Sequence, residues 1–138
     1  MPAKDLFHDN VKNALIKDGW TITHDPLVIR MSKKRLYVDL GAERVIAAER
    51  DTEKIAVEVK GFTKASDMQA LEEALGQCIL YSRLLSRYDP DRKVYLAVPD
   101  PVYESVFEEE VGQILIEDGL LSLVTFDITQ EKLIRWIP

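Results

Sequence analysis

The chain has 138 residues, a length typical of one domain, and 46% of them are hydrophobic, enough for a substantial core. The net charge of −6 and the pI near 5.0 argue against generic, high-affinity adhesion to nucleic acid, although a local basic strip stays compatible with them. The single cysteine, Cys78, excludes an internal disulfide framework and every cysteine-based zinc site.

Targeting and membrane segments are not visible in the sequence. No basic leader precedes an apolar run, and no apolar stretch approaches ~18 residues. We therefore expect a cytoplasmic protein without membrane contact, folded as a single domain over residues 1–138.

The first predicted element is an amphipathic helix over residues 5–18, which ends before Gly19. Its apolar residues recur at helical spacing: Phe7, Val11, Ala14 and Leu15. His8 is interpreted as an ordinary polar residue of this helix. A short strand is expected around residues 27–29, entered through Pro26.

Residues 37–60 are expected to supply two further strands. Asp39 lies near the start of an apolar run, which continues through Gly41, and a tight turn is expected near residues 51–52. The second strand has the sequence IAVEVK, in which Glu58 and Lys60 face one side and Ile55, Val57 and Val59 face the other. Together with the strand around 27–29, these strands predict an antiparallel meander.

The C-terminal half predicts two helices and two strands. Ser66 and Gln69 form a capping box for a helix to about Tyr88, with one apolar face made of Met68, Leu71, Leu75, Cys78, Ile79 and Leu85. Residues 93–98 predict a strand buried on both faces. A helix from Asp100 to about Asp118 should turn five residues inward: Val106, Phe107, Val111, Ile114 and Leu115. Residues 121–126 predict a last strand, and residues 136–138 are expected to pack on the core.

The predicted order is therefore helix, three strands, helix, strand, helix, strand. The late strand-helix-strand connection favours an α/β fold with a mixed sheet flanked by helices and a right-handed crossover.

Asp39, Glu58 and Lys60 are the residues that point to chemistry. Glu and Lys are poor strand formers, so their place in IAVEVK calls for a reason. Two neighbouring carboxylates repel unless a cation joins them, and Mg²⁺ is held by one or two carboxylates together with waters and phosphate oxygens. A lysine beside them can polarise a water for attack on phosphorus. The alternative is an exposed ion pair between Glu58 and Lys60, worth ~0–1 kcal/mol.

This element order, with Asp39, Glu58 and Lys60, resembles the PD-(D/E)XK nuclease superfamily, whose fold is restriction-endonuclease-like, although Val38 stands where proline often precedes the acid. The resemblance implies that these three residues are catalytic. It also implies that Asp39, Glu58 and the carbonyl of Val59 bind Mg²⁺ or Mn²⁺.

Two further features follow from the same resemblance. Gln77 and Tyr81 look like the Gln-x-x-x-Tyr motif of RecB-type members; they share a helix face and are implied to orient the site from a second layer. The alternative for this pair is a helix flank whose tyrosine packs on the sheet. The superfamily also allows an acid from the first helix, Asp5, without requiring one.

The whole chain resembles the XisH family, cyanobacterial factors that control excision of the fdxN DNA element. The matching segments are residues 3–15, 17–20, 39–43, 55–60 and 74–77. The resemblance implies a role in programmed DNA excision, alongside a recombinase and a small partner of the XisI type. It does not imply a demonstrated nuclease.

Three functions remain open from the sequence. The first is a metal-dependent DNA endonuclease, in which duplex cleavage would favour a homodimer. The second is a regulatory protein without catalysis that binds an XisI-type partner, and the third is a module that oligomerises through residues 100–118. The basic residues Arg30, Lys33, Lys34 and Arg35 are either DNA contacts or an ordinary solvated turn.

Overall fold

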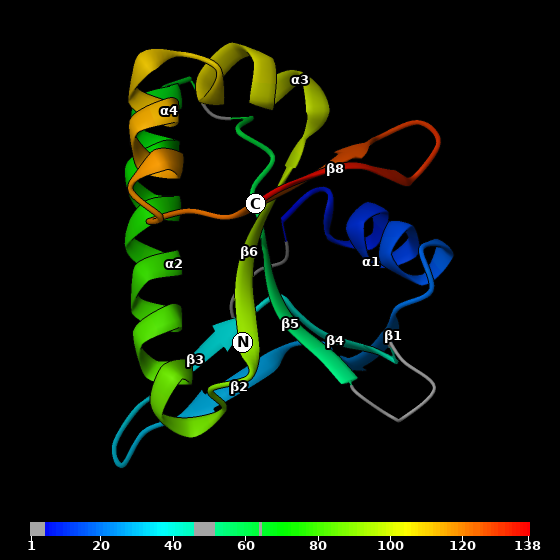
Figure 1. Ribbon diagram of the computed structural model, residues 1–138, viewed down its shortest axis with the longest axis vertical. Helices are drawn as coiled ribbons and strands as arrows, with labels where there is room; N and C mark the ends of the chain where they lie inside the picture. Colours follow the sequence, from blue (N-terminus) through cyan, green and yellow to red (C-terminus); the bar gives the residue numbers. More distant parts are fainter. Residues whose placement is uncertain (1–4, 46–51, 64) are drawn as a thin grey trace.

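A six-stranded mixed sheet forms the centre of the computed structural model, which describes residues 5–45, 52–63 and 65–138 (Figure 1). The strand order in this sheet is β1-β4-β5-β6-β7-β8, and β2 and β3 form a separate two-stranded hairpin. The helices are α1 (His8–Lys17), α2 (Asp67–Tyr88), α3 (Asp100–Val102), a π-helix (Tyr103–Phe107) and α4 (Glu110–Glu117). The strands are β1 (Thr21–His24), β2 (Leu27–Arg30), β3 (Arg35–Val38), β4 (Leu40–Val45), β5 (Thr52–Val59), β6 (Arg92–Pro99), β7 (Leu123–Asp127) and β8 (Lys132–Ile137).

The sheet separates two hydrophobic clusters. One face packs against α1, and the other packs against α2, the π-helix and the β2–β3 hairpin, as Figure 1 shows. The alternation predicted for β5 is confirmed. Ile55, Val57 and Val59 lie in the hydrophobic cluster on the α1 side of the sheet, whereas Ala56 lies in the cluster on the α2 side. β6 is buried on both faces, as predicted, and runs parallel to β5 and β7. The predicted mixed α/β sheet flanked by helices is confirmed.

The predicted meander is wrong. Residues 27–29 lie in β2, which pairs with β3 outside the main sheet, while the unpredicted strand β1 pairs with β4. The link between the two sheets is a bend at Asp39 and not at Gly41, which lies inside β4 opposite Ala56. Of the turn predicted near residues 51–52, residue 51 is outside the described residues and Thr52 begins β5.

α2 begins as the capping box predicts, because the Ser66 Oγ accepts a hydrogen bond from the Gln69 backbone N–H at 3.1 Å. Its buried face differs from the predicted one, since Met68 and Ile79 are 50% and 37% exposed. The residues that face the core are Ala70, Leu71, Ala74, Cys78, Tyr81 and Leu85. Ala70 and Ala74, which the prediction left out of the buried face, belong to it, and their small side chains leave room for the helix to lie close to the sheet.

The predicted helix from Asp100 to Asp118 is broken into α3, the π-helix and α4. Val106 and Phe107 are buried as predicted, whereas Val111 and Ile114 are 38% and 47% exposed. The interruption after Phe107 rotates the apolar residues of α4 relative to Val106 and Phe107 of the π-helix. The C-terminal residues do pack on the core, as an unpredicted edge strand, β8, antiparallel to β7.

Candidate functional site

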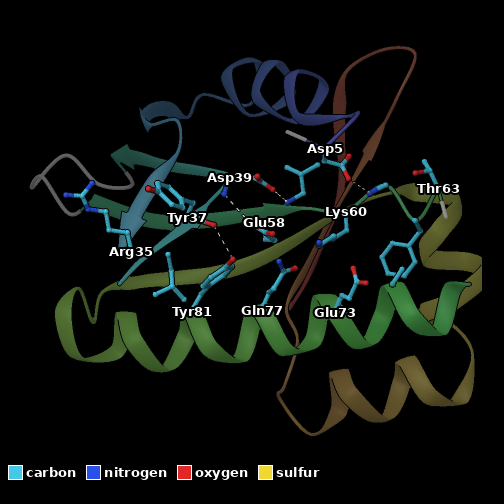
Figure 2. A pocket seen from close by; sticks show the side chains of 15 residues that line it. Asp5, Arg35, Tyr37, Asp39, Glu58, Lys60, Thr63, Glu73, Gln77 and Tyr81 are labelled. Carbon is cyan, nitrogen blue, oxygen red and sulfur yellow. Dashed lines mark hydrogen bonds between the residues drawn. The ribbon is translucent and has the colours of Figure 1, made fainter. Parts of the chain in front are cut away.

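A cavity of about 530 Å³ lies between α2 and the ends of β3 and β5. Figure 2 shows its labelled side chains, with Glu73, Gln77 and Tyr81 projecting from α2 toward those on the sheet side. The full lining is Asp5, Arg35, Leu36, Tyr37, Asp39, Glu58, Val59, Lys60, Gly61, Phe62, Thr63, Ala70, Glu73, Gln77 and Tyr81. The structure thus brings Asp39, Glu58, Val59, Lys60, Gln77 and Tyr81 into one place.

Hydrogen bonds between backbone and carboxylate fix the two central acids. The Val59 N–H donates to Asp39 Oδ2 at 2.7 Å, and the Asp39 N–H donates to Glu58 Oε1 at 3.3 Å. Asp39 can reach across in this way because it lies in the bend that carries the chain from the hairpin into β4. Two carboxylates from separate segments are therefore held side by side.

The acid pair lies in surroundings that disfavour two negative charges. Glu58 is 5% exposed, and its burial together with the nearby charge of Asp39 raises its pKa to about 8, against the opposing effect of the Lys60 ammonium. Burial also raises the pKa of Asp39. A positive charge between the two groups would relieve both effects, which is what a divalent cation supplies.

The donor set fits a hard cation. The candidate ligands are Asp39, Glu58 and the Val59 carbonyl, all from residues that line the cavity. In the described part of the chain no group of three His, Cys, Asp or Glu side chains is placed to hold a metal ion, so this set has only two acidic side chains. Mg²⁺ is characteristically held by one or two carboxylates and keeps several waters. The buried Gln77 Oε1 has no hydrogen-bond partner among the described residues, and its side chain lines the cavity, so it can accept a hydrogen bond from a water there.

Tyr81 and Gln77 have different parts in the wall of the cavity. The Tyr81 hydroxyl donates to the Tyr37 backbone carbonyl at 3.1 Å and ties α2 to β3. Tyr81 is 6% exposed, so it also packs on the sheet. The tyrosine therefore sets the distance between the two walls, while Gln77 offers a polar atom to the interior.

His8 is a residue of the site that the sequence interpretation missed, because it is 3% exposed and not an ordinary polar helix residue. Its Nε2 donates to Asp25 Oδ1 at 2.7 Å, and its Nδ1 lies 4.0 Å from Asp39 Oδ1. Lys12 pairs with the other oxygen of Asp25 at 2.8 Å. A signal was present, since His8 precedes Val11 and Leu15 by three and seven residues and so lies on the apolar face.

Asp5 precedes α1, which begins at His8 and not at residue 5 as predicted. Its two carboxylate oxygens accept from the Phe7 N–H at 2.9 Å and from the Gly61 N–H at 3.1 Å. A Cβ at Gly61 would come within 2.7 Å of the Phe7 ring, so glycine is required for this close approach. Asp5 lines the cavity and also holds the segment that follows β5 against α1.

The four basic residues singled out in the sequence are exposed on or beside the β2–β3 hairpin. Arg35 lines the cavity, and Arg30, Lys33 and Lys34 lie farther from it. The hairpin therefore places positive charge at one end of an acidic cavity.

The raised pKa of Glu58 predicts a pH dependence of stability in metal-free buffer. In the unfolded chain this carboxyl has an ordinary pKa near 4.5, so between that pH and about 8 the folded state binds more protons. The unfolding free energy should therefore fall as the pH rises from about 5.5 to 8, with a slope of at most about 1.4 kcal/mol per unit. Urea unfolding at several pH values measures this slope, and Glu58→Gln should flatten it; an equal slope in parent and variant would contradict the assignment.

No helix in the described part of the chain has the length and apolar character that a membrane crossing demands.

Comparisons with known proteins place the chain in a family. The family model described as XisH protein matches residues 1–134. An XisH family protein from Nostoc punctiforme PCC 73102 is 41% identical, with a TM-score of 0.86 over 97% of this chain and 100% of the other. An fdxN element excision controlling factor protein from Anabaena variabilis is 40% identical, with a TM-score of 0.86 over 98% and 100% of the two chains. No match to a curated protein is found. The chain belongs to the XisH family.

Proposed function

We propose that this protein takes part in excision of a DNA element, as the name of its Anabaena variabilis relative states for that protein, and that it hydrolyses DNA at the Asp39–Glu58 site. The observation that carries the catalytic part is the buried acid pair, with the pKa of Glu58 raised to about 8, beside Lys60 in one cavity. This arrangement agrees with the PD-(D/E)XK resemblance of the sequence. The cytoplasmic location expected from the sequence is part of the same proposal.

Each residue has a definite part in the proposed reaction. Asp39, Glu58 and the Val59 carbonyl would hold Mg²⁺ or Mn²⁺, which when bound would stabilise the charge that develops on the phosphate. The Lys60 ammonium would orient the attacking water, whose proton would be lost to solvent. The Gln77 Oε1 accepts a hydrogen bond from a water in the cavity, and Tyr81 keeps α2 at its distance from β3.

The charge of the cavity explains how an acidic chain could act on DNA. Four acidic side chains line it, Asp5, Asp39, Glu58 and Glu73, against the two cations Arg35 and Lys60. Without a metal ion this lining repels phosphate, whereas a bound divalent cation balances the excess. Metal loading should therefore precede DNA binding at this site.

Calorimetric titration with Mg²⁺ or Mn²⁺ tests the site directly. The parent is expected to give a saturable binding curve, and Asp39→Asn should lose it because one of two charged ligands is gone. Asp91→Asn, which removes an exposed acid outside the cavity lining, is the matched control and should bind as the parent does. Equal metal binding by parent and Asp39→Asn would overturn the assignment.

A second candidate is a regulatory protein that cleaves nothing and binds a small partner of the XisI type. The observation in its favour is an apolar group on and after α4, where Val111, Ile114 and Leu120 are 38%, 47% and 44% exposed. The same apolar group is also a candidate contact surface for a second copy of the chain. Co-purification with an XisI-type protein, together with no cleavage of DNA in Mg²⁺ or Mn²⁺, would favour this candidate.

A further inference from the structure

The acid pair lies at the floor of a two-walled cavity. Glu58 is 5% exposed, α2 forms one wall, and β3 of the β2–β3 hairpin forms the other with Arg35 and Tyr37 (Figure 2). The volume of about 530 Å³ falls within the roughly 300–1,000 Å³ of pockets that enclose one small organic ligand. A phosphate that reaches the floor must therefore descend between a helix and a hairpin.

A paired strand would reach the floor only with one wall in each of its two grooves. In B-form DNA each backbone has the major groove on one side and the minor groove on the other, with widths of about 12 and 6 Å. An α-helix with its side chains is about 10–12 Å across, and a helix or a two-stranded ribbon fills the major groove. One wall would have to enter the narrow minor groove, where proteins place strands only by bending the duplex and opening the groove, at a cost in free energy. An unpaired strand has no such restriction.

A basic strip continues from the cavity along the hairpin. An open depression of about 500 Å³ is lined by Arg30, Met31, Ser32, Lys33, Lys34 and Arg35, and it shares Arg35 with the cavity. Arg30 and Arg35 are direct cross-strand partners, a like-charge pairing that destabilises a hairpin unless an anion lies nearby. No ion pair is found for these cations among the described residues.

We propose that the cavity and the strip form one groove for an unpaired DNA strand. One phosphate lies over Asp39 and Glu58, and the phosphates on one side of it lie on Arg35, Lys34 and the rest of the hairpin. Tyr37, half buried in the wall, offers a ring on which a base can stack. The cleavage step and the metal ion beneath the central phosphate rest on the proposed function, whereas the contacts of the strand with the hairpin do not.

Binding is measured by fluorescence anisotropy, with Ca²⁺ filling the site in place of Mg²⁺. The probes are fluorescein-labelled oligothymidylate and the same strand in a blunt duplex with oligodeoxyadenylate. The single strand is expected to bind about tenfold tighter or more at equal salt. Arg35→Ala and Lys34→Ala should each reduce the slope of log affinity against log salt by about 0.7, the value of one phosphate contact to a single strand. Lys132→Ala, on β8 at the far edge of the sheet, should leave the slope unchanged.

Cleavage assays separate this inference from the nuclease proposal. With Mg²⁺, a duplex that carries a single-stranded flap is expected to be cut in the unpaired segment. Tight binding of the single strand without cleavage in Mg²⁺ or Mn²⁺ would support the proposed groove and contradict the proposed nuclease activity. Cutting within a blunt duplex, equal or tighter duplex binding, or salt slopes that Arg35→Ala leaves unchanged would reject the groove.

Discussion

Lys60→Ala is expected to lower the rate of Mg²⁺-dependent DNA cleavage by about 10²–10⁴-fold, the usual contribution of a positioned acid or base. The side chain lines the cavity next to Glu58, while the Lys60 backbone N–H donates to the Ala97 carbonyl at 3.0 Å. The truncation therefore removes the ammonium and keeps the hydrogen bond that holds the end of β5 to β6. Single-turnover cleavage of labelled DNA measures the rate, and thermal unfolding checks the fold.

Metal must be saturating in this experiment. The Lys60 ammonium lowers the pKa of Glu58, so its loss should make that carboxylate harder to ionise and the ion harder to bind. Lys93→Ala, an exposed lysine on β6, is the matched control and should cleave at the parental rate. Parental cleavage by Lys60→Ala at saturating metal would exclude the catalytic role.

Gly112→Ala is expected to destabilise the protein by about 3 kcal/mol, at the upper end of typical overpacking. A Cβ at Gly112 would lie 2.4 Å from the Phe107 Cα and 2.7 Å from the Val106 carbonyl oxygen, and both are backbone atoms that cannot rotate away. Phe107 is fully buried, so the clash cannot be relieved without moving the core. The Phe107 ring packs edge-on against the Phe62 ring, with 5.9 Å between the ring centroids. Because Phe62 lines the cavity, the variant should disturb that lining as well.

Gly76→Ala provides the matched control and should have the opposite sign. Gly76 lies in α2 on an exposed face, and a Cβ there meets nothing within 4 Å. Alanine should therefore stabilise the protein by about 0.5–1 kcal/mol. In thermal unfolding the Gly112 variant is expected to melt roughly 10 °C below the parent, and the Gly76 variant a few degrees above it. Melting of the Gly112 variant within a few degrees of the parent would show that the π-helix–α4 junction relaxes freely.

The parts of the site that local pattern predicts are those carried by one element. Alternation along IAVEVK places Glu58 and Lys60 on one side of β5, because successive side chains of a strand point to opposite faces. Helical spacing likewise places Gln77 and Tyr81 on one flank of α2. Both placements follow from short-range geometry, and the structure shows both pairs lining the cavity.

What local pattern could not supply is the pairing of distant segments. The position of Asp39 depends on β4 pairing with β1 and β5 while β3 pairs with β2, and antiparallel partners cannot be chosen from the strand sequences alone. The same limit explains why β8 was not predicted, because its pairing with β7 depends on tertiary structure and not on local sequence pattern. The break between α3 and α4 was hidden for another reason, since the apolar spacing of residues 100–118 also fits an unbroken helix.

The bend at Asp39 joins two tasks in one residue. On its N-terminal side the chain is the basic hairpin, and its own carboxylate is held by the Val59 N–H. In the proposed role, a DNA strand that binds the hairpin exerts force on Val38, and one peptide bond transmits this force to Asp39, a ligand of the metal ion. Binding of the DNA strand and binding of the metal ion therefore depend on the same bend. A hairpin exchanged for that of a relative would keep both functions only if the exchanged segment also included an acid at the position of Asp39.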